Sequence, residues 1–188
     1  MPPRILPLTS GNAYHIYNRG VNKDPIFLED CHYSMFLFRL REHIQDKAEV
    51  IAYCLMPNHF HLLLQISSEG FVNSALQPFL VSYAKAFSNQ IGRVGPLFQG
   101  RYKANLIHDD TYLLDCVKYI HLNPVKAGLV INPVQWTYSS YRDYVNVKKS
   151  TFVNTSTVMQ FFDSQEEFRD HTEIGMEEYG SKYFKDFS

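Results

Sequence analysis

The chain has 188 residues, of which 45% are hydrophobic and 15% aromatic, and its formal net charge at pH 7 is −1. This length allows one well-packed core, and this composition excludes a disordered chain. No apolar run approaches the roughly 20 residues that a membrane-spanning helix needs. The first residues lack the apolar core of a secretory signal, so we expect a cytoplasmic protein. The three cysteines have no C-x-x-C spacing and are expected to be small core residues.

The charges are distributed unevenly along the chain. No Asp or Glu occurs between Glu69 and Asp109, whereas four basic residues do, and residues 151–188 carry eight acidic and three basic side chains. An acid-free stretch of this length favours an anionic partner. On charge alone, a chance distribution over a neutral surface explains it about as well.

Four stretches have the residue pattern of β-strands. Apolar and polar residues alternate over 13–19, and two apolar runs, 50–56 and 59–66, are separated by the turn formers Pro57-Asn58. The last two runs therefore predict a β-hairpin. A further extended segment is expected over 98–107.

Three stretches have the apolar spacing of helices, namely 28–45, 71–91 and 111–122. Asp110 is expected to cap the third. Pro124 disfavours helical geometry at the preceding residue, so this helix should bend or stop there, with one more turn ending at Gly128.

The order strand–helix–strand–strand–helix–strand–helix predicts an α+β fold of the ferredoxin-like, split-βαβ type. We expect an antiparallel sheet with helices on one side, an extra helix after the last strand, and a helical tail. The domain is expected to span residues 1–144. Residues 145–188 are expected to form an acidic tail or lid with a capping box at Ser164, and not an independent domain.

His59 and His61 are the first candidate site residues. Because side chains alternate along a strand, both imidazoles point to the same side of the sheet, and Phe60 between them points into the core. Two desolvated imidazoles both need partners, which can be a metal, a phosphate or a hydrogen-bonded core network. The spacing alone puts metal or phosphate binding only slightly ahead of a structural role.

Tyr119 and Asn123 are four residues apart and so share one helix face. If that face packs over the two histidines, a phenol, an amide and two imidazoles form a compact polar site. This spacing often occurs by accident. His121 should project to another side of the helix, and we interpret it as structural or as support for the site from behind.

Five motifs stand in one order along the chain: Tyr-His-Ile-Tyr-Asn-Arg-Gly at 14–20, Met-Pro-Asn-His-Phe-His-Leu-Leu at 56–63, Gly-Pro-Leu-Phe-Gln-Gly-Arg-Tyr-Lys at 95–103, Tyr-Ile-His-Leu-Asn-Pro-Val-Lys-Ala-Gly-Leu-Val at 119–130 and Trp-Thr-Tyr-Ser-Ser-Tyr at 136–141. Together they resemble the single-tyrosine HUH transposases of the insertion-sequence type, in the branch associated with repetitive extragenic palindromes. The resemblance covers about residues 10 to 145. Each motif is moderately specific, and the ordered set is highly specific.

The resemblance implies a role for each matching residue. His59 and His61 match the histidines that hold a divalent cation on the scissile phosphate, and Tyr119 matches the nucleophile that forms a 5′-phosphotyrosine. Asn123 stands where insertion-sequence relatives carry a glutamine as third metal ligand, and its shorter side chain leaves direct coordination open. The family implies Mg²⁺ or Mn²⁺, whereas the ligand types would suit zinc, nickel or copper better.

Contact with single-stranded or hairpin DNA is the partner that the resemblance implies. Arg101 and Lys103 alternate to the same face of the expected strand 98–107, with Gln99 beside them, as a platform for a phosphate backbone. The further candidates for DNA contact are Asn18, Arg19, Lys85, Arg93 and Lys126.

The sequence therefore predicts a metal-dependent endonuclease and strand transferase that cuts and rejoins single-stranded DNA at palindromic hairpins. One alternative is a domesticated protein that binds hairpins without cutting them, although the presence of His59, His61 and Tyr119 argues against it. Another is a histidine-pair phosphodiesterase acting on a small substrate, which a closed pocket near His59 would favour. The sequence leaves open which hairpin is recognised, what the tail does, and whether the chain acts as a monomer in cis or as a homodimer in trans.

Overall fold

The computed structural model describes residues 7–147 and 150–174. Four strands form one antiparallel sheet in the order β2-β3-β1-β4. They are β1 (Ala13–Arg19), β2 (Ala48–Met56), β3 (His59–Ile66) and β4 (Lys103–Leu106). This order, with α1 joining β1 to β2 and α2 joining β3 to β4, confirms the predicted ferredoxin-like α+β fold.

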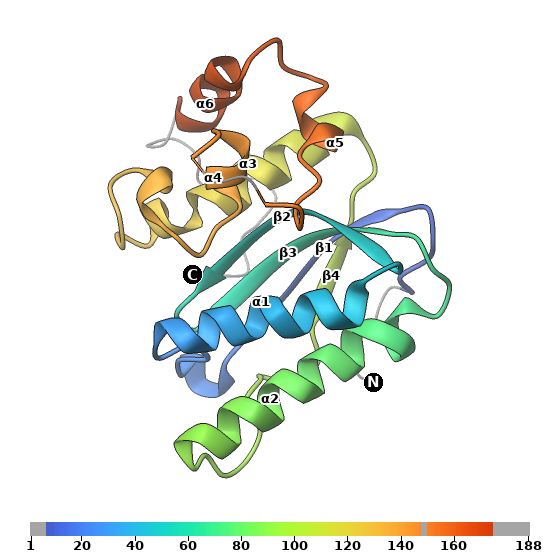
Figure 1. Ribbon diagram of the computed structural model, residues 1–188, viewed down its shortest axis with the longest axis vertical. Helices are drawn as coiled ribbons and strands as arrows, with labels where there is room; N and C mark the ends of the chain where they lie inside the picture. Colours follow the sequence, from blue (N-terminus) through green and yellow to red (C-terminus); the bar gives the residue numbers. More distant parts are fainter. Residues whose placement is uncertain (1–6, 148–149, 175–188) are drawn as a thin grey trace.

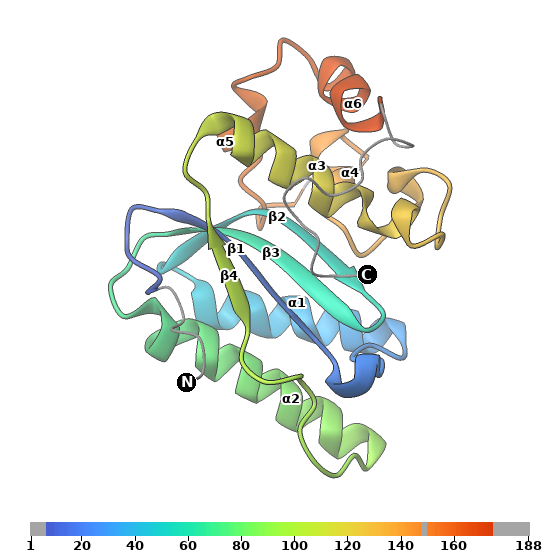
Figure 2. The same ribbon diagram turned by 180° about the vertical axis from the view of Figure 1, so that it is seen from behind.

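Helices cover both faces of this sheet (Figures 1 and 2). α1 and α2 lie on one face, and α3 with the C-terminal segments lies on the other. The longer helices are α1 (Asp30–Ile44), α2 (Gln77–Ile91), α3 (Asp110–Lys126) and α6 (Gln165–Glu173). The shorter ones are η1 (Val21–Lys23), η2 (Val72–Leu76), η3 (Pro133–Gln135), α4 (Tyr141–Tyr144) and α5 (Ser156–Met159). Among the described residues, no helix combines the length and the apolar character needed to cross a bilayer.

Burial on both faces explains why β2 and β3 are apolar runs and do not alternate like surface strands. On the α1/α2 face, the ring of Phe60 in β3 packs against Phe36 of α1, with centroids 5.1 Å apart, and Phe36 packs against Phe79 of α2 at 4.8 Å. All three side chains are fully buried. The main core therefore lies between the sheet and these two helices, and it holds β3 in a fixed register.

The C-terminal segment packs behind α3 and along β2. Val153 forms a bridge with Val50, and the amide of Asn154 donates to the carbonyl of Val50 at 2.8 Å. Phe168 of α6 is buried and stacks on Tyr144, with ring centroids 4.8 Å apart. Half of the capping box predicted at the start of α6 is present: the side chain of Ser164 accepts a hydrogen bond from the backbone amide of Glu167, whereas the carboxylate of Glu167 accepts from the amide of Asp163 and not from that of Ser164.

Three details predicted for these elements were wrong. The residue that caps α3 is Asp109, whose side chain accepts a hydrogen bond from the amide of Tyr112 at 2.7 Å, and Asp110 is the first residue of the helix. The extended segment 98–107 shortens to β4 because Gly100 has φ +75°, a left-handed conformation that breaks an extended run, so Gln99 and Arg101 lie in the preceding loop. Pro124 lies inside α3 and does not end it. A proline so close to the end of a helix removes only one of its hydrogen bonds. The helix ends at Lys126, and Gly128, the residue expected to end it, follows the C-cap residue Ala127 in the left-handed conformation with φ +68°.

Candidate active site

His59 and His61 lie together beneath α3. Their rings are 5.0 Å apart between centroids and nearly perpendicular, at 88°. The alternation of β3 places both on this face, while Phe60 points the other way into the main core. The same-face prediction for the two histidines is therefore confirmed by the geometry.

Tyr119 reaches this pair from α3. Its ring lies edge-on to the ring of His61, with centroids 5.4 Å apart, and only 4% of the residue is exposed. One turn further on, the side-chain amide of Asn123 donates to the carbonyl of Tyr119 at 2.8 Å. Residues that are sixty positions apart in the sequence are thus brought together, and all four come from one chain.

His15 is a member of this cluster that the sequence analysis did not single out. Its Nε2 lies 2.9 Å from Nδ1 of His61 in a buried hydrogen bond, and its ring lies 6.0 Å from the ring of Tyr119. Tyr17, two residues along β1, lies 4.9 Å from His15 and 6.1 Å from His61 between ring centroids. The alternation of residues 13–19 already indicated that His15 and Tyr17 share a face. It did not indicate that β1 would pair with β3.

The histidines are held in the neutral form. Burial lowers the pKa of His15 to about 3, and burial, with a smaller contribution from the charge of Arg19, lowers that of His59 to about 4. Burial also lowers the pKa of His61 well below its ordinary value, assisted by the two neighbouring histidines. At neutral pH each ring therefore carries one ring hydrogen and one lone pair, and a lone pair on nitrogen is what a metal ion binds.

Tyr119 is also held in its neutral form. Burial raises the pKa of its phenol, and hydrogen bonding by the amide of Asn123 acts in the opposite direction. The ammonium group of Lys126 lies 5.1 Å from the centre of the same ring. A neutral phenol is a poor nucleophile, so a positive charge close to it is chemically significant.

The donor set of the site fits a divalent cation that shares its shell with a substrate. Among residues 7–147 and 150–174, no group of three or more His, Cys, Asp and Glu side chains could hold a metal ion. The chain therefore offers the two neutral imidazoles of His59 and His61, and the amide oxygen of Asn123 is a further candidate. Water and phosphate oxygens would have to complete such a shell.

Four of the predicted DNA contacts lie on the same side of the sheet as Tyr119. Arg19 is opposite His59 in the β1–β3 register, and its Nε donates to Oε1 of Gln99 at 2.7 Å. Lys103 is opposite Tyr17 in the β1–β4 register, with its Nζ 6.0 Å from the centre of that ring. Lys126 is exposed at the end of α3. These four flank the histidines.

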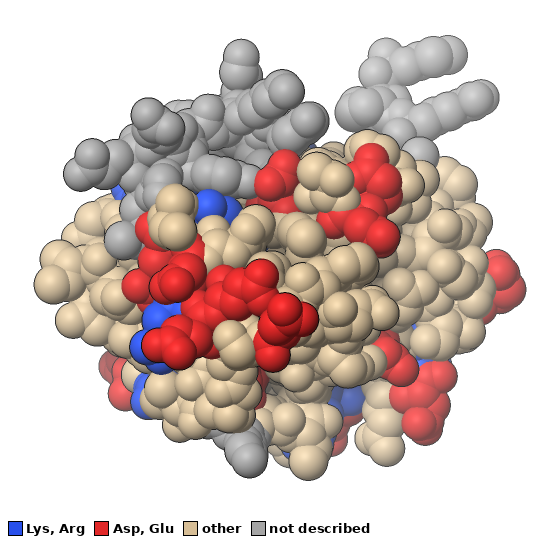
Figure 3. Space-filling model, turned by 90° about the horizontal axis from the view of Figure 1, so that it is seen from above, with Lys and Arg blue, Asp and Glu red and all other residues tan. Residues whose placement is uncertain are grey.

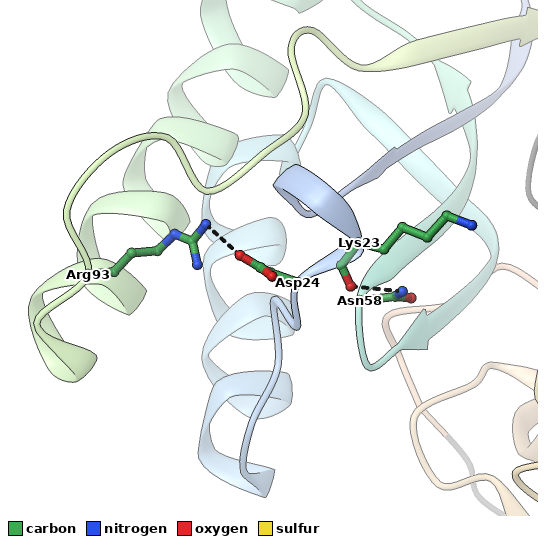
Figure 4. Close-up of polar contacts among 4 residues, drawn as sticks. All are labelled: Lys23, Asp24, Asn58 and Arg93. Atoms are coloured by element: carbon green, nitrogen blue, oxygen red, sulfur yellow. Dashed lines mark hydrogen bonds and ion pairs between the residues drawn. The ribbon is translucent and has the colours of Figure 1, made fainter.

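The other four predicted contacts lie elsewhere. Lys85 is exposed on α2, across the sheet from the histidines, and Arg93 forms an ion pair with Asp24 at 3.1 Å (Figure 4). Asn18 and Arg101 help to line a cavity of about 520 Å³ between the start of α2 and residues 98–102. The side chain of Asn18 is held there by a hydrogen bond to the carbonyl of Gly100 at 3.3 Å. The eight residues therefore do not form one continuous surface.

The tail supports the tyrosine helix from behind. Nζ of Lys118 donates to the carbonyls of His171 and Ile174, both at 2.7 Å, at the C-terminal end of α6. His121 is buried, with its Nε2 2.8 Å from the hydroxyl of Ser140. It faces the tail, and the structural role expected for it agrees with this position.

Acidic side chains gather on the end of the molecule that carries α6. Figure 3 looks onto this end and shows many Asp and Glu side chains with few Lys and Arg among them. The exposed acids of α6 and the residues before it are Asp163, Glu166, Glu167 and Asp170. This end is electrostatically unfavourable for a polyanion.

Comparison with known proteins assigns the chain to a family. The model of the family described as "Transposase IS200 like" matches residues 9–123, a range that contains both histidines of β3, Tyr119 and Asn123. A Haemophilus influenzae protein inferred to be a REP-associated tyrosine transposase is 34% identical over 107 residues. That match covers 50% of this chain and 58% of the relative, so the chain aligns with little more than half of the relative's length.

Among solved structures, a REP-associated tyrosine transposase bound to a REP hairpin matches with a TM-score of 0.63. The match covers 82% of this chain and 97% of the other, at 20% identity, and so it shows the shared fold. The resemblance inferred from the five motifs is confirmed by the family match and by the curated relative. The histidine pair, the tyrosine helix above it and the matched range of residues lead to one conclusion, that this chain belongs to the IS200-like transposase family.

Proposed function

We propose that this chain is a metal-dependent endonuclease and strand transferase that cuts and rejoins single-stranded DNA at palindromic hairpins, with Tyr119 as the nucleophile. The observation that carries the proposal is that the ring of Tyr119 lies beside the histidine pair of β3, with its centroid 5.4 Å from that of His61. Hairpin DNA as substrate is supported by the relative named for its association with REP sequences and by the fold neighbour bound to a REP hairpin.

The proposed reaction is a transesterification at phosphorus. The phenolic oxygen of Tyr119 forms a bond to the scissile phosphorus, the bond from phosphorus to the 3′ oxygen breaks, and the proton lost by the phenol ends on that 3′ oxygen. The products are a 5′-phosphotyrosine and a 3′-hydroxyl. Because one phosphodiester replaces another, a second 3′-hydroxyl can reverse the step and join a new strand without ATP.

The two histidines of β3 are the proposed ligands of the cation, and Asn123 is a candidate third ligand. A bound Mg²⁺ or Mn²⁺ would offset negative charge on the phosphoryl oxygens as phosphorus becomes five-coordinate. Burial keeps the imidazoles of His59 and His61 neutral, which leaves their lone pairs available to a cation at neutral pH.

The distribution of charge supports one direction of approach for DNA. Arg19, Lys103 and Lys126 lie on the side of the sheet where Tyr119 lies, with Gln99 beside Arg19, whereas the end at α6 is acidic. We therefore place the scissile strand along β1 and β4. The remaining candidates, Asn18, Lys85, Arg93 and Arg101, would contact only a DNA segment that continues around the edge of the sheet.

The origin of the site residues supports action in cis by a monomer. His59, His61, Tyr119 and Asn123 come together within one chain, without a residue from a second copy. A DNA substrate is also consistent with the cytoplasmic location expected from the sequence.

The decisive experiment is to incubate the full chain with a labelled hairpin oligonucleotide and Mn²⁺, and to look for a covalent protein–DNA adduct under denaturing conditions. We expect an adduct with the native chain, no adduct after addition of EDTA, and none with Tyr119→Phe. Tyr17→Phe is the sharpest control, because Tyr17 also lies beside His15 and His61. Tyr112→Phe, on the same helix, controls for the loss of a hydroxyl from another buried tyrosine.

Two results would overturn the proposal. One is an adduct that persists in Tyr119→Phe and disappears in Tyr17→Phe, because the nucleophile would then be on β1. The other is tight hairpin binding without an adduct under any divalent metal, because the chain would then be a DNA-binding protein.

A further inference from the structure

The side chain of Asn58, in the turn between β2 and β3, links His59 to the backbone of a distant loop. Its Nδ2 donates to the carbonyl of Lys23 at 3.2 Å (Figure 4), and its Oδ1 lies 2.7 Å from Nδ1 of His59. A backbone carbonyl can only accept, so the nitrogen of the amide must face Lys23 and its oxygen must face His59. The amide oxygen in turn can only accept, so Nδ1 of His59 carries the hydrogen and Nε2 carries the lone pair.

The loop that carries Lys23 is joined to the turn between β2 and β3 by backbone hydrogen bonds. The amide of Gly20 donates to the carbonyl of Asn58 at 2.8 Å, and the amides of Ile26 and Phe27 donate to the carbonyl of Pro57 at 2.8 and 3.0 Å. A Cβ on Gly20 would lie 2.0 Å from the carbonyl oxygen of Asp24, so only glycine allows this close approach.

The same loop is tied to a second element by an ion pair. The carboxylate of Asp24 meets the guanidinium of Arg93, which follows α2, at 3.1 Å (Figure 4). The loop 20–27 and the turn at Pro57-Asn58 therefore form one packed unit that presents a fixed acceptor to His59.

The second histidine has a corresponding partner. Nδ1 of His61 lies 2.9 Å from Nε2 of His15, with both rings buried and stacked at 5.1 Å between centroids. The hydrogen of this bond can belong to either ring. If His61 is the donor, its lone pair is on Nε2, as in His59. If His15 is the donor, the lone pair of His61 points at His15 and cannot bind a cation.

We infer that Asn58 and His15 are positioning residues, each of which accepts the Nδ1 hydrogen of the neighbouring histidine and so directs Nε2 of His59 and of His61 toward a shared divalent cation. For His59 the assignment follows from the hydrogen bonds alone. For His61 the assignment rests on the proposed function. The role of both histidines as ligands of a cation rests on it as well. Both rings stay neutral throughout, and Asn58 and His15 decide only which nitrogen carries the hydrogen. Neighbours of this kind orient the ligands of a metal and raise their basicity.

The direct test is nitrogen NMR on the full chain labelled with ¹⁵N-histidine, without metal or DNA, in which long-range couplings distinguish the two tautomers. We expect hydrogen on Nδ1 for both His59 and His61 in the native chain. Asn58→Ala should release His59 and leave His61 unchanged, and His15→Phe should do the reverse, so each variant is the control for the other. Asn58→Asp keeps an acceptor and should keep the Nδ1-hydrogen form of His59.

The second readout is the affinity for Mn²⁺ alone, followed by electron paramagnetic resonance. Asn58→Ala and His15→Phe should each weaken binding by about 10- to 100-fold, and Asn58→Asp should restore most of it. Hydrogen on Nε2 of either histidine in the native chain would overturn the inference, and so would an affinity for Mn²⁺ that neither variant changes. Neither readout involves Tyr119, so failure to form a DNA adduct would be a separate result.

Discussion

The ammonium nitrogen of Lys126 lies 5.1 Å from the centre of the Tyr119 ring, two helical turns further along α3. Partial desolvation of its ammonium group, followed by the charge of Lys118, lowers the pKa of Lys126 although the residue as a whole is exposed, while burial raises the pKa of the phenol. The charged form of each group is therefore less stable here than it would be in water. A phenolate and an ammonium would stabilise each other as a pair, so this contact favours ionisation of the Tyr119 phenol, the proposed nucleophile.

The first prediction follows from that contact. Lys126→Met should slow formation of the DNA adduct by roughly 10- to 100-fold, because a cation about 5 Å from the phenol favours its ionised form by a few kcal/mol in a partly screened site. Lys126→Arg should retain much of the rate. Single-turnover adduct formation, measured at saturating hairpin DNA, separates this effect from DNA binding, and an unchanged rate in Lys126→Met would contradict the prediction.

Acid should destabilise this fold over a defined range of pH. Burial lowers the pKa values of His15, His59 and His121 to about 3, 4 and 3, from 6.5 for the unfolded chain. Below pH 6.5 the unfolded state thus binds more protons than the folded state. The stability that comes from keeping these histidines neutral is therefore complete above pH 6.5. Toward pH 4 the free energy of unfolding should fall by up to about 1.4 kcal/mol per pH unit for each histidine.

Urea denaturation between pH 7.5 and 4.5 measures this slope. His121→Phe keeps a ring in the tail-side core and should make the slope shallower. A native chain whose stability does not change between pH 6.5 and 4.5 would contradict the prediction.

The tail should contribute to the stability of the whole domain. Phe168 is 1% exposed and stacks on Tyr144, whereas Phe161 in the same segment is 38% exposed. Phe168→Ala should lower the free energy of unfolding by about 3 to 5 kcal/mol, and Phe161→Ala by less than about 1 kcal/mol. Thermal denaturation monitored by circular dichroism measures both changes. If Phe168→Ala lowers the stability as little as Phe161→Ala does, the tail is not part of the same cooperative unit.

Gly20 should be essential for the loop that supports His59. Gly20→Ala forces a Cβ against the carbonyl oxygen of Asp24, so we expect a lower melting temperature together with weaker binding of Mn²⁺. Gly11→Ala is the control, because Gly11 has φ +82° and open space around it. It should cost only about 1 kcal/mol of left-handed strain and leave Mn²⁺ binding unchanged.

Local features of the structure could be predicted from the sequence because they depend on neighbours a few residues away. The period of two in β3 puts His59 and His61 on one face, and the spacing of four in α3 puts Tyr119 near Asn123. The limits of the same approach appear at Gly100 and Pro124. At Pro124 the helix-breaking tendency of proline was outweighed by its position in the last turn of a long helix, whereas at Gly100 a left-handed glycine ended the extended run that the alternation of residues 98–107 predicted.

The sequence by itself determined the long helices and strands, their order and the family that the five motifs indicate. Only the tertiary structure decided the register of β1 against β3, which brings His15 to His61, and that the loop at Lys23 reaches the turn at Asn58. It also separated Lys85 and Arg93 from the basic residues around Tyr119. Strand pairing and loop packing join residues far apart in the chain, and the free energy that selects one partner over another comes from burial and from hydrogen bonds that exist only after the whole core has formed.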